Sequence, residues 1–351
     1  MYRYTKQFHT ALVEWFEREK RDLPWRHTQD PYKIWVSEVM LQQTRVDTVI
    51  PYYENFLEKF PTMQDLAEAE EEFLLKQWEG LGYYSRVRNL QAGVREVVEN
   101  YGGIVPNNRV DILKLKGVGP YTAGAILSIA YEVPEHAVDG NVMRVLSRVL
   151  MIDEDIALPK TKKVFEKAVM DLMDYDHPSQ FNQGLMELGA MICTPTSPSC
   201  LLCPVRDYCT AFHEGEPEKL PIKTKKIKTK KLYYDVAVVV DESGKLLLEQ
   251  RPETGLLASM WQFPMVEVQP EVIPEVALSR TYQFALRNKE TLMPLKHVFS
   301  HLQWHIQSYV LGAERTEETT GQWFTLEEVK ALPLPVPMQK LFTAYEKSIG
   351  Q

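Results

Sequence analysis

The chain has 351 residues, of which 44% are hydrophobic and 25% charged, as in ordinary soluble proteins with room for two domains. Its formal net charge of −8 excludes a uniformly basic nucleic-acid-binding protein and restricts any basic surface to a local patch. No apolar run approaches the roughly 18 residues of a membrane span, and the charged N-terminus lacks the apolar core of a secretory signal. We therefore expect a cytoplasmic monomer without a membrane partner.

The chain from Gln7 to about Tyr208 shows helical periodicity almost throughout. One apolar stripe of this kind is formed by Phe8, Leu12, Trp15 and Phe16. Proline and glycine turn signals separate the helical stretches. The pattern predicts an all-α domain over residues 1–213.

Two short polar stretches of this domain combine aromatic and basic residues. Trp25 and Arg26 lie in L-P-W-R, and L-G-Y-Y-S-R contains Leu81 and Tyr83. A tyrosine in a turn is usually a surface residue with one buried face. Beside a nucleic-acid site, it could instead stack on a base or wedge into a duplex.

Glu38 lies in an otherwise apolar helical stretch, I-W-V-S-E-V-M-L-Q-Q-T. A lone glutamate there usually faces solvent. Alternatively, apolar surroundings raise its pKa, so that it can act as a general acid near neutral pH. Gln43 and Thr44 end the stretch, where they form either a polar helix terminus or contacts to base edges.

The segment L-K-G-V-G-P-Y-T-A contains a two-glycine turn formed by Gly117, Val118 and Gly119. The turn precedes a helical pattern over 121–131, so its backbone N–H groups could bind an anion beside a helix N-terminus. We interpret this turn as a binding site for a phosphate of nucleic acid.

Asp139 and Asn141 follow in V-D-G-N, directly before another helical pattern. Both residue types are favoured helix N-caps, which is the ordinary explanation. The nearby glycine turn favours a second explanation. An ionised carboxylate beside a protonated one supports the oxocarbenium-like transition state of glycosidic cleavage.

All four cysteines of the chain lie within 17 residues, with six, two and five residues between successive members: Cys193, Cys200, Cys203 and Cys209. In a reducing compartment this clustering indicates a metal site before disulfides. Zinc and an iron–sulfur cluster both remain open, because a count of four thiolates does not distinguish them.

Residues 214–231 form a basic linker, with seven lysines and no acid between Lys219 and Lys231. Beyond it, over 232–351, the apolar period becomes two. A hairpin is predicted from 233–240 and 245–250, a later strand around 302–308, and helices near 326–332 and 336–347. These elements predict an α+β domain.

The histidines at positions 297, 301 and 305 are spaced four apart, which on a helix would suggest a metal site. The alternation around 302–308 indicates a strand instead, where four residues span about 13 Å. We therefore expect no shared metal coordination by these residues.

Together these residues resemble the helix-hairpin-helix DNA glycosylases, and within them the adenine-specific MutY family. The resemblance covers nearly the whole chain and rests on L-K-G-V-G-P-Y-T-A, V-D-G-N, S-E-V-M-L-Q-Q-T and the cysteine spacing. It implies a multidomain protein: an all-α helix-hairpin-helix glycosylase domain with an iron–sulfur loop at 193–209, followed by an α+β Nudix-like C-terminal domain.

The resemblance also implies an activity, excision of adenine paired with 8-oxoguanine or with guanine in duplex DNA after base flipping. Glu38 would protonate N7 of adenine, Asp139 would stabilise the positive sugar, and Tyr121 and Asn141 would position them. Gln183 matches a position that faces the flipped adenine. The four cysteines would hold a [4Fe-4S] cluster, and the V-F-S-H loop would intercalate Phe299 and read 8-oxoguanine with Ser300 and His301.

Three departures refine this expectation. Tyr121 stands where bifunctional relatives carry a nucleophilic lysine, which predicts little strand-cleaving lyase activity. No R-E-x-x-E-E run follows Trp261, so Nudix pyrophosphatase activity is disfavoured. Gly184 replaces a frequent alanine of the family, and the sequence offers no functional account of it.

Three other functions remain open from the sequence. One is another helix-hairpin-helix glycosylase, acting on mismatched thymine or an oxidised pyrimidine. Another is a non-catalytic lesion-binding protein. The last is hydrolysis of damaged nucleotides by the second domain.

Overall fold

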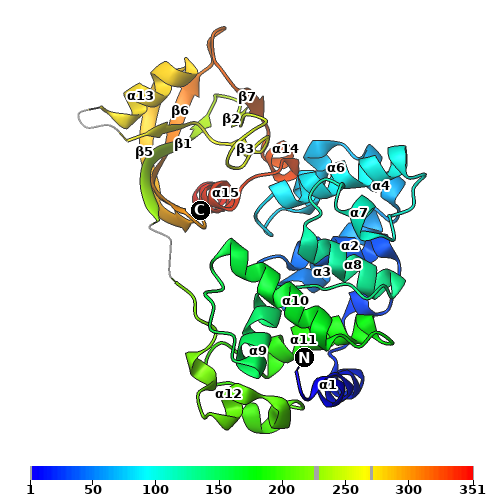
Figure 1. Cartoon of the computed structure of the whole chain (residues 1–351). Coiled ribbons are helices and arrows are strands. Elements are labelled where there is room, and N and C mark those ends of the chain that lie inside the picture. The colour runs from blue at the N-terminus through cyan, green and yellow to red at the C-terminus, as the bar shows by residue number, and fades with distance from the viewer. Residues whose placement is uncertain (1, 225–228, 269–271, 351) are drawn as a thin grey trace. The chain divides into compact units, whose positions relative to one another are not determined.

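The computed structural model describes residues 2–224, 229–268 and 272–350. It divides into two compact units (Figure 1). The helical unit comprises Met1–Glu68 and Arg88–Lys225, and the sheet unit comprises Ala69–Val87 and Lys226–Gln351. The predicted domain boundaries, with a linker at 214–231, stay a prediction, and residues 225–228 of that linker lie outside the described residues.

The helical unit is all-α, as predicted. Its helices are α1 (Thr5–Glu19), α2 (Pro31–Leu41), α3 (Val46–Lys59), α4 (Met63–Glu68), most of α6 (Ser85–Asn100), α7 (Arg109–Ile112), α8 (Pro120–Tyr131), α9 (Gly140–Leu150), α10 (Lys162–Leu172), α11 (Pro178–Met191) and α12 (Thr210–His213). Among the described residues, none of the helices has the length and apolar character needed to cross a membrane.

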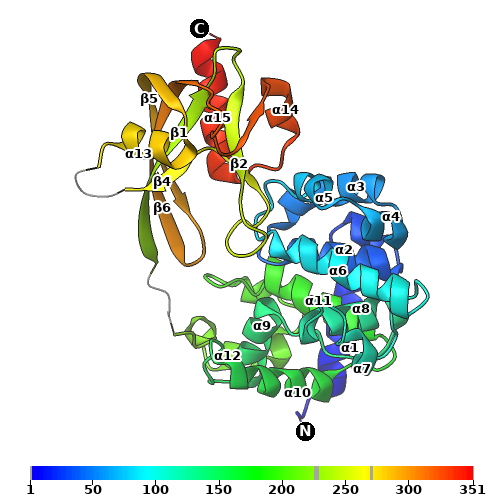
Figure 2. The same ribbon diagram turned by 90° about the horizontal axis from the view of Figure 1, so that it is seen from above.

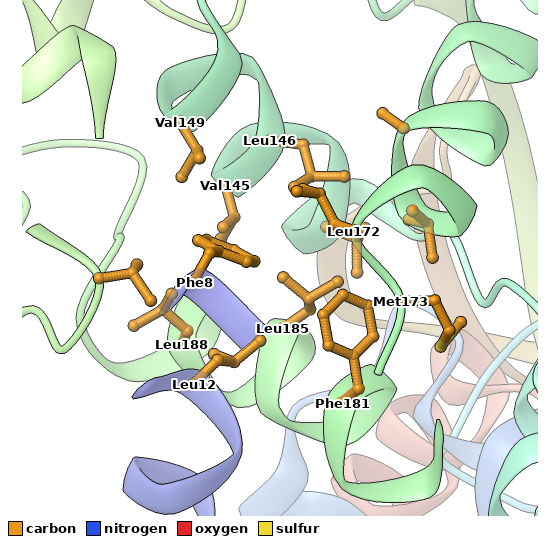
Figure 3. Close-up of a cluster of buried hydrophobic side chains, with 14 of the residues drawn as sticks. Phe8, Leu12, Val145, Leu146, Val149, Leu172, Met173, Phe181, Leu185 and Leu188 are labelled. Carbon is orange, nitrogen blue, oxygen red and sulfur yellow. The ribbon is translucent and has the colours of Figure 1, made fainter. Parts of the chain in front are cut away.

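Helices α1, α9, α10 and α11 enclose one hydrophobic core (Figure 3). The apolar stripe predicted for α1 supplies its whole buried face, which comprises Phe8, Leu12, Trp15 and Phe16. Val145, Leu146 and Val149 of α9 meet this face together with Leu185 and Leu188 of α11. Each fully buried side chain of this size contributes roughly 1.5–3 kcal/mol.

Gly184 lies on the face of α11 that packs against α1. A Cβ atom at this position would lie 3.2 Å from Leu12 Cγ and 3.4 Å from Phe16 Cβ. A glycine inside a helix costs about 1 kcal/mol relative to alanine. Close packing of α1 on α11 offsets that cost and gives Gly184 a structural role that the sequence did not reveal.

The sheet unit contains strands in the order β3-β2-β1-β6-β5, with β4 paired to β1 and β7 paired to β2. The strands are β1 (Lys230–Val240), β2 (Leu246–Gln250), β3 (Trp261–Gln262), β4 (Met265–Glu267), β5 (Ala285–Val298), β6 (Leu302–Glu314) and β7 (Gln322–Phe324). The helices of this unit are α5 (Glu71–Gln77), α13 (Pro274–Tyr282), α14 (Leu326–Ala331) and α15 (Val336–Ile349). Strands β1 and β2 are antiparallel, which confirms the predicted hairpin.

Helices α13 and α15 cover opposite faces of the sheet (Figure 2). Val236 and Val238 of β1 belong to the apolar cluster that includes α15, whereas Ala237 and Val239 belong to the cluster that includes α13. Because successive strand side chains point to opposite faces, a continuous apolar run is needed where both faces are covered. The run V-A-V-V at residues 236–239 of β1 meets that need.

The expectation that one strand carries the spaced histidines is wrong. His297 is near the end of β5, His301 lies in the turn, and His305 lies in β6, where it pairs with Lys296. The antiparallel hairpin formed by β5 and β6 folds the chain back within this stretch. The alternation from 302 to 308 revealed the second strand but not the turn before it.

The packed core of the helical unit generates a stability prediction. Leu185→Ala should lower its free energy of unfolding by roughly 2–5 kcal/mol, because it deletes a fully buried side chain and leaves a cavity. Urea unfolding followed by circular dichroism measures the change. The control, Lys163→Ala at an exposed position of α10, should change stability by no more than about 0.5 kcal/mol.

Candidate active site

A cavity of about 660 Å³ lies in the helical unit among α2, α8, α11 and the N-terminus of α9. Helix α8 packs against both α2 and α11, which brings residues far apart in the sequence to one place. Glu38 lines this cavity, as do ten other residues that the sequence predicted for the site: Trp25, Arg26, Gln43, Thr44, Gly117, Gly119, Tyr121, Asp139, Asn141 and Gln183.

Glu38 is buried, with 5% of its surface exposed, so of the two alternatives left open by the sequence the solvent-facing one does not apply. Helix α2 begins at Pro31 and is capped by Asp30, whose side chain accepts a hydrogen bond from the Tyr32 N–H. Tyr121, in the first turn of α8, donates its hydroxyl to Glu38 Oε2 over 2.6 Å. This bond joins α2 to α8 inside the cavity.

Burial raises the pKa of Glu38 from 4.5 to about 7. The hydrogen bond from Tyr121 opposes this rise, and the negative charge of Asp139 adds to it. A carboxyl group with this pKa is substantially protonated near neutral pH. It can therefore donate a proton to a bound base.

Asp139 is both a helix cap and a member of the cavity wall. Its Oδ1 accepts the Val142 N–H over 2.7 Å, and its Oδ2 accepts the Asn141 side-chain amide over 3.0 Å. Burial raises the pKa of Asp139, while these hydrogen bonds lower it. The two explanations offered by the sequence are thus compatible, because the capping bond also fixes the carboxylate beside Glu38.

Asn141 links this carboxylate to the cysteine loop. Its Oδ1 accepts a hydrogen bond from Arg144 Nη2 over 2.7 Å, and Arg144 Nε donates to the carbonyl of Cys193 over 2.7 Å. One turn of α9 therefore connects the active-site cavity to the first cysteine.

Sequence reasoning missed a buried ion-pair group at the cavity wall. The side chain of Glu187, on α11, is 2% exposed and contacts Arg21 Nη2 at 2.7 Å and Arg26 Nη2 at 2.9 Å. Burial alone would raise its pKa, but hydrogen bonds from the two guanidinium groups lower it to about 2. A charged residue inside the apolar stretch of α11 was the available signal, of the same kind that identified Glu38.

The glycine turn has the predicted position at the N-terminus of α8. Its two glycines, Gly117 and Gly119, line the cavity, but its central residue, Val118, does not. Gly117 has φ of +77°, a conformation that favours glycine, and a Cβ there would lie 2.7 Å from Asn89 Cβ. The side chain of Val118 is buried and its N–H donates to the Leu115 carbonyl.

The remaining predicted DNA contacts belong to the sheet unit. Leu81 is buried, whereas Tyr83 in the same turn is 46% exposed. Ser300 and His301 are exposed in the turn between β5 and β6. The ring of Phe299 is partly buried and packs edge-on against Trp304 at 4.9 Å between centroids.

The four cysteines are free thiols around a second, small cavity of the helical unit. Burial raises the pKa of Cys203 to about 12 and that of Cys209 to about 11, so thiolates there need a positive partner. Arg148 contributes one contact, a hydrogen bond of 3.2 Å from Nη1 to Cys193 Sγ. Among the described residues, no three histidine, cysteine, aspartate or glutamate side chains are spaced to hold a single metal ion.

Three known families match the chain. The HhH-GPD superfamily of base excision DNA repair proteins matches residues 36–173, the iron-sulfur binding domain of endonuclease III matches 193–209, and the NUDIX domain matches 235–344. These matches confirm the predicted fold class, a helical glycosylase domain with an iron–sulfur loop and a Nudix-like α+β domain. They also confirm the iron–sulfur cofactor over zinc.

The chain is similar over nearly its full length to adenine DNA glycosylases. The protein from Mus musculus is 37% identical, covering 97% of this chain and 78% of its own length. The protein from Buchnera aphidicola subsp. Baizongia pistaciae is 31% identical, with 98% of both chains covered.

Among solved structures, a thermostable thymine-DNA glycosylase has a TM-score of 0.55 and 31% identity, covering 60% of this chain and 97% of that one. A trapped endonuclease III-DNA covalent intermediate has a TM-score of 0.52 and 24% identity, covering 61% and 98%. At 24% identity, the similarity to endonuclease III is evidence for the fold alone.

The buried carboxyl group generates a pH prediction. The folded state holds the Glu38 proton more tightly than the unfolded chain, so wild-type stability should fall as pH rises from about 4.5 through 7. Glu38→Gln cannot ionise and avoids this loss. Through this effect the variant should gain about 3 kcal/mol relative to the wild type at pH 8, less than about 1 kcal/mol at pH 5 and almost nothing at pH 4.

Urea unfolding of both proteins at several pH values measures this difference. A constant difference between them across the pH range would contradict the raised pKa.

Proposed function

The chain belongs to the adenine DNA glycosylases of the helix-hairpin-helix superfamily, and from this premise we propose that its substrate is adenine paired with 8-oxoguanine in duplex DNA. The protein is a DNA N-glycosylase of base excision repair. The observation that carries the proposal is the buried Glu38, hydrogen-bonded to Tyr121 and close enough to Asp139 for their charges to interact.

In this proposal Glu38 protonates N7 of the flipped adenine and weakens the bond between base and sugar. General acid catalysis of this kind contributes about 10²–10⁴-fold. As the bond breaks, positive charge develops on the sugar, and the Asp139 carboxylate stabilises it. Tyr121 and Asn141 fix the two carboxyl groups through the hydrogen bonds described above.

The other cavity residues bind the base and the backbone. Trp25, Arg26, Gln183, Gln43 and Thr44 all line the cavity. In this proposal the first three contact the flipped adenine, and Gln43 and Thr44 contact the DNA strand. Gly117 and Gly119 bind a phosphate at the N-terminus of α8.

The cysteines at positions 193, 200, 203 and 209 are the ligands of the iron–sulfur cluster in this proposal. Bound by these four thiolates, a cluster would cross-link the loop that follows α11. Arg148 donates to Cys193 Sγ and also to the carbonyl of Thr194 over 2.8 Å, so this chain's own contribution is to orient the first cysteine.

The sheet unit supplies lesion recognition rather than a second hydrolase. Ser300 and His301 are exposed at a hairpin turn, where they can contact 8-oxoguanine, with Phe299 as the intercalating residue. Helix α13, the helix that follows β4, carries one carboxylate, Glu275, and Lys289 pairs with it at 2.7 Å. This helix therefore lacks the carboxylate set that a Nudix hydrolase needs to hold Mg²⁺.

Single-turnover assays on three duplexes test the substrate. Adenine opposite 8-oxoguanine should be excised faster than thymine opposite guanine or thymine glycol. Glu38→Gln should lower the rate at least 100-fold, as expected for loss of the general acid. Faster excision of either thymine substrate would refute the proposal, and unchanged excision by Glu38→Gln would assign Glu38 a structural role.

Tyr121 generates a further prediction, because a phenol cannot form a Schiff base with the sugar. Borohydride added during excision should trap no covalent protein–DNA adduct beyond the background of the Glu38→Gln variant. Efficient trapping by the wild type, seen as a shifted band on a denaturing gel, would show a lyase nucleophile elsewhere in the cavity.

A further inference from the structure

The segment Ala69–Val87 belongs to the same compact unit as the C-terminal sheet, although more than 140 residues separate them in the sequence. Helix α5 occupies its first half. The turn that carries Leu81 and Tyr83 occupies its second half. The segment therefore joins a surface of the sheet unit to a turn predicted to contact DNA.

Three hydrogen bonds hold α5 and its C-terminal end to the sheet unit. Trp261 Nε1, on β3, donates to Glu72 Oε2 over 2.9 Å. Lys76 Nζ donates to the Leu332 carbonyl over 3.1 Å, and the Leu334 N–H donates to Glu79 Oε1 over 2.9 Å. Each of these contacts has a charged partner, which makes it stronger than a neutral hydrogen bond.

Two of these contacts are made with one short loop, between α14 and α15. Lys76 and Glu79 bind the loop residues 332 and 334, and they pair with each other at 2.7 Å. From its other side, the Trp261 N–H donates to the Pro333 carbonyl over 3.0 Å. The loop is thus fixed between β3 and α5, so the position of β3 determines the position of α5.

The turn after α5 has a defined shape. Gly80, Gly82 and Tyr83 have φ values of 100°, 70° and 48°. Trp78 Nε1 donates to the Gly82 carbonyl over 3.2 Å, and Arg86 Nη2 donates to the carbonyls of residues 81 and 82 at 3.1 Å. These bonds fix the backbone at Tyr83, whose side chain remains 46% exposed.

Trp261 on β3 belongs to the same apolar cluster as Trp304, and Phe299 of the lesion-reading turn at 299–301 packs against that cluster. We propose that α5 is a coupling element. Glu72 on α5, Glu79 just after it and Trp261 on β3 are positioning residues that hold the Tyr83 turn in a fixed relation to the lesion-reading turn. The proposal rests on the proposed function of those two turns. Contacts to 8-oxoguanine by the sheet unit then also place Tyr83 against the duplex. The resulting increase in excision rate is specific to 8-oxoguanine, because guanine lacks the 8-oxo group that the lesion-reading turn recognises.

The experiment uses the full-length holoenzyme and two variants at opposite ends of the contact. Trp261→Phe removes one N–H donor and keeps an aromatic ring in place. Glu79→Ala removes the acceptor of the Leu334 N–H, and Glu79→Gln restores a neutral acceptor. Glu70→Ala, at an exposed position directly before α5, is the matched control.

Single-turnover excision of adenine is measured opposite 8-oxoguanine and opposite guanine. Trp261→Phe and Glu79→Ala should each slow excision opposite 8-oxoguanine about tenfold or more, as for loss of one charge-assisted hydrogen bond. Excision opposite guanine should stay within about twofold of the wild type. Glu79→Gln should recover most of the loss, and Glu70→Ala should show none.

A parallel loss on both substrates, together with a lower Tm, would mean that the contacts only stabilise the fold and would overturn the coupling. Unchanged rates in both variants would also overturn it. If Glu79→Ala does not fold, Trp261→Phe alone decides between these outcomes.

Tyr83→Ala separates failure of the coupling from failure of the proposed function. If Tyr83→Ala slows excision opposite 8-oxoguanine but the α5 variants do not, only the coupling is wrong. If the wild type shows no preference for 8-oxoguanine, or Tyr83→Ala has no effect, the proposed role of the turns fails and the coupling fails with it.

Discussion

The hydrogen bond from Tyr121 to Glu38, inside the cavity, is the interaction on which the chemistry depends, because it fixes the position of the buried carboxyl group. Glu38 and Glu187 are both buried glutamates that line the same cavity. Two arginines hold the pKa of Glu187 near 2, whereas burial and the charge of Asp139 raise that of Glu38 to about 7. One glutamate is therefore fixed as an anion that orients Arg21 and Arg26, and the other retains a proton for transfer.

Helix α9 organises the other half of the site. Asp139 caps its N-terminus and faces the cavity, and Arg144, one turn later, donates to the backbone of the first cysteine. The capping bond, a common local device, here also fixes a functional carboxylate in position. The iron–sulfur loop is thus connected to the Asp139 carboxylate through Arg144 and Asn141.

Much of this could be predicted from sequence, because periodicity identified the helices and Glu38 interrupted an apolar stretch. The pairing of Glu187 with Arg21 and Arg26 could not be predicted, since about 160 residues separate the glutamate from the two arginines. The apolar stretch around Glu187 could mark that residue but not its partners. Separation in the sequence also hides the contact of Glu79 with Leu334. Gly184 became understandable only when α1 was seen to pack against it.

The central claim is that Glu38 carries a proton near neutral pH before DNA binds. Titration of its side-chain carboxyl by carbon-13 NMR, with a spectrum of Glu38→Gln to assign the signal, tests this claim most directly. We expect a midpoint near pH 7, which falls in Asp139→Asn because a neighbouring negative charge is removed. A midpoint near 4.5 in the wild type, unchanged by Asp139→Asn, would contradict the account.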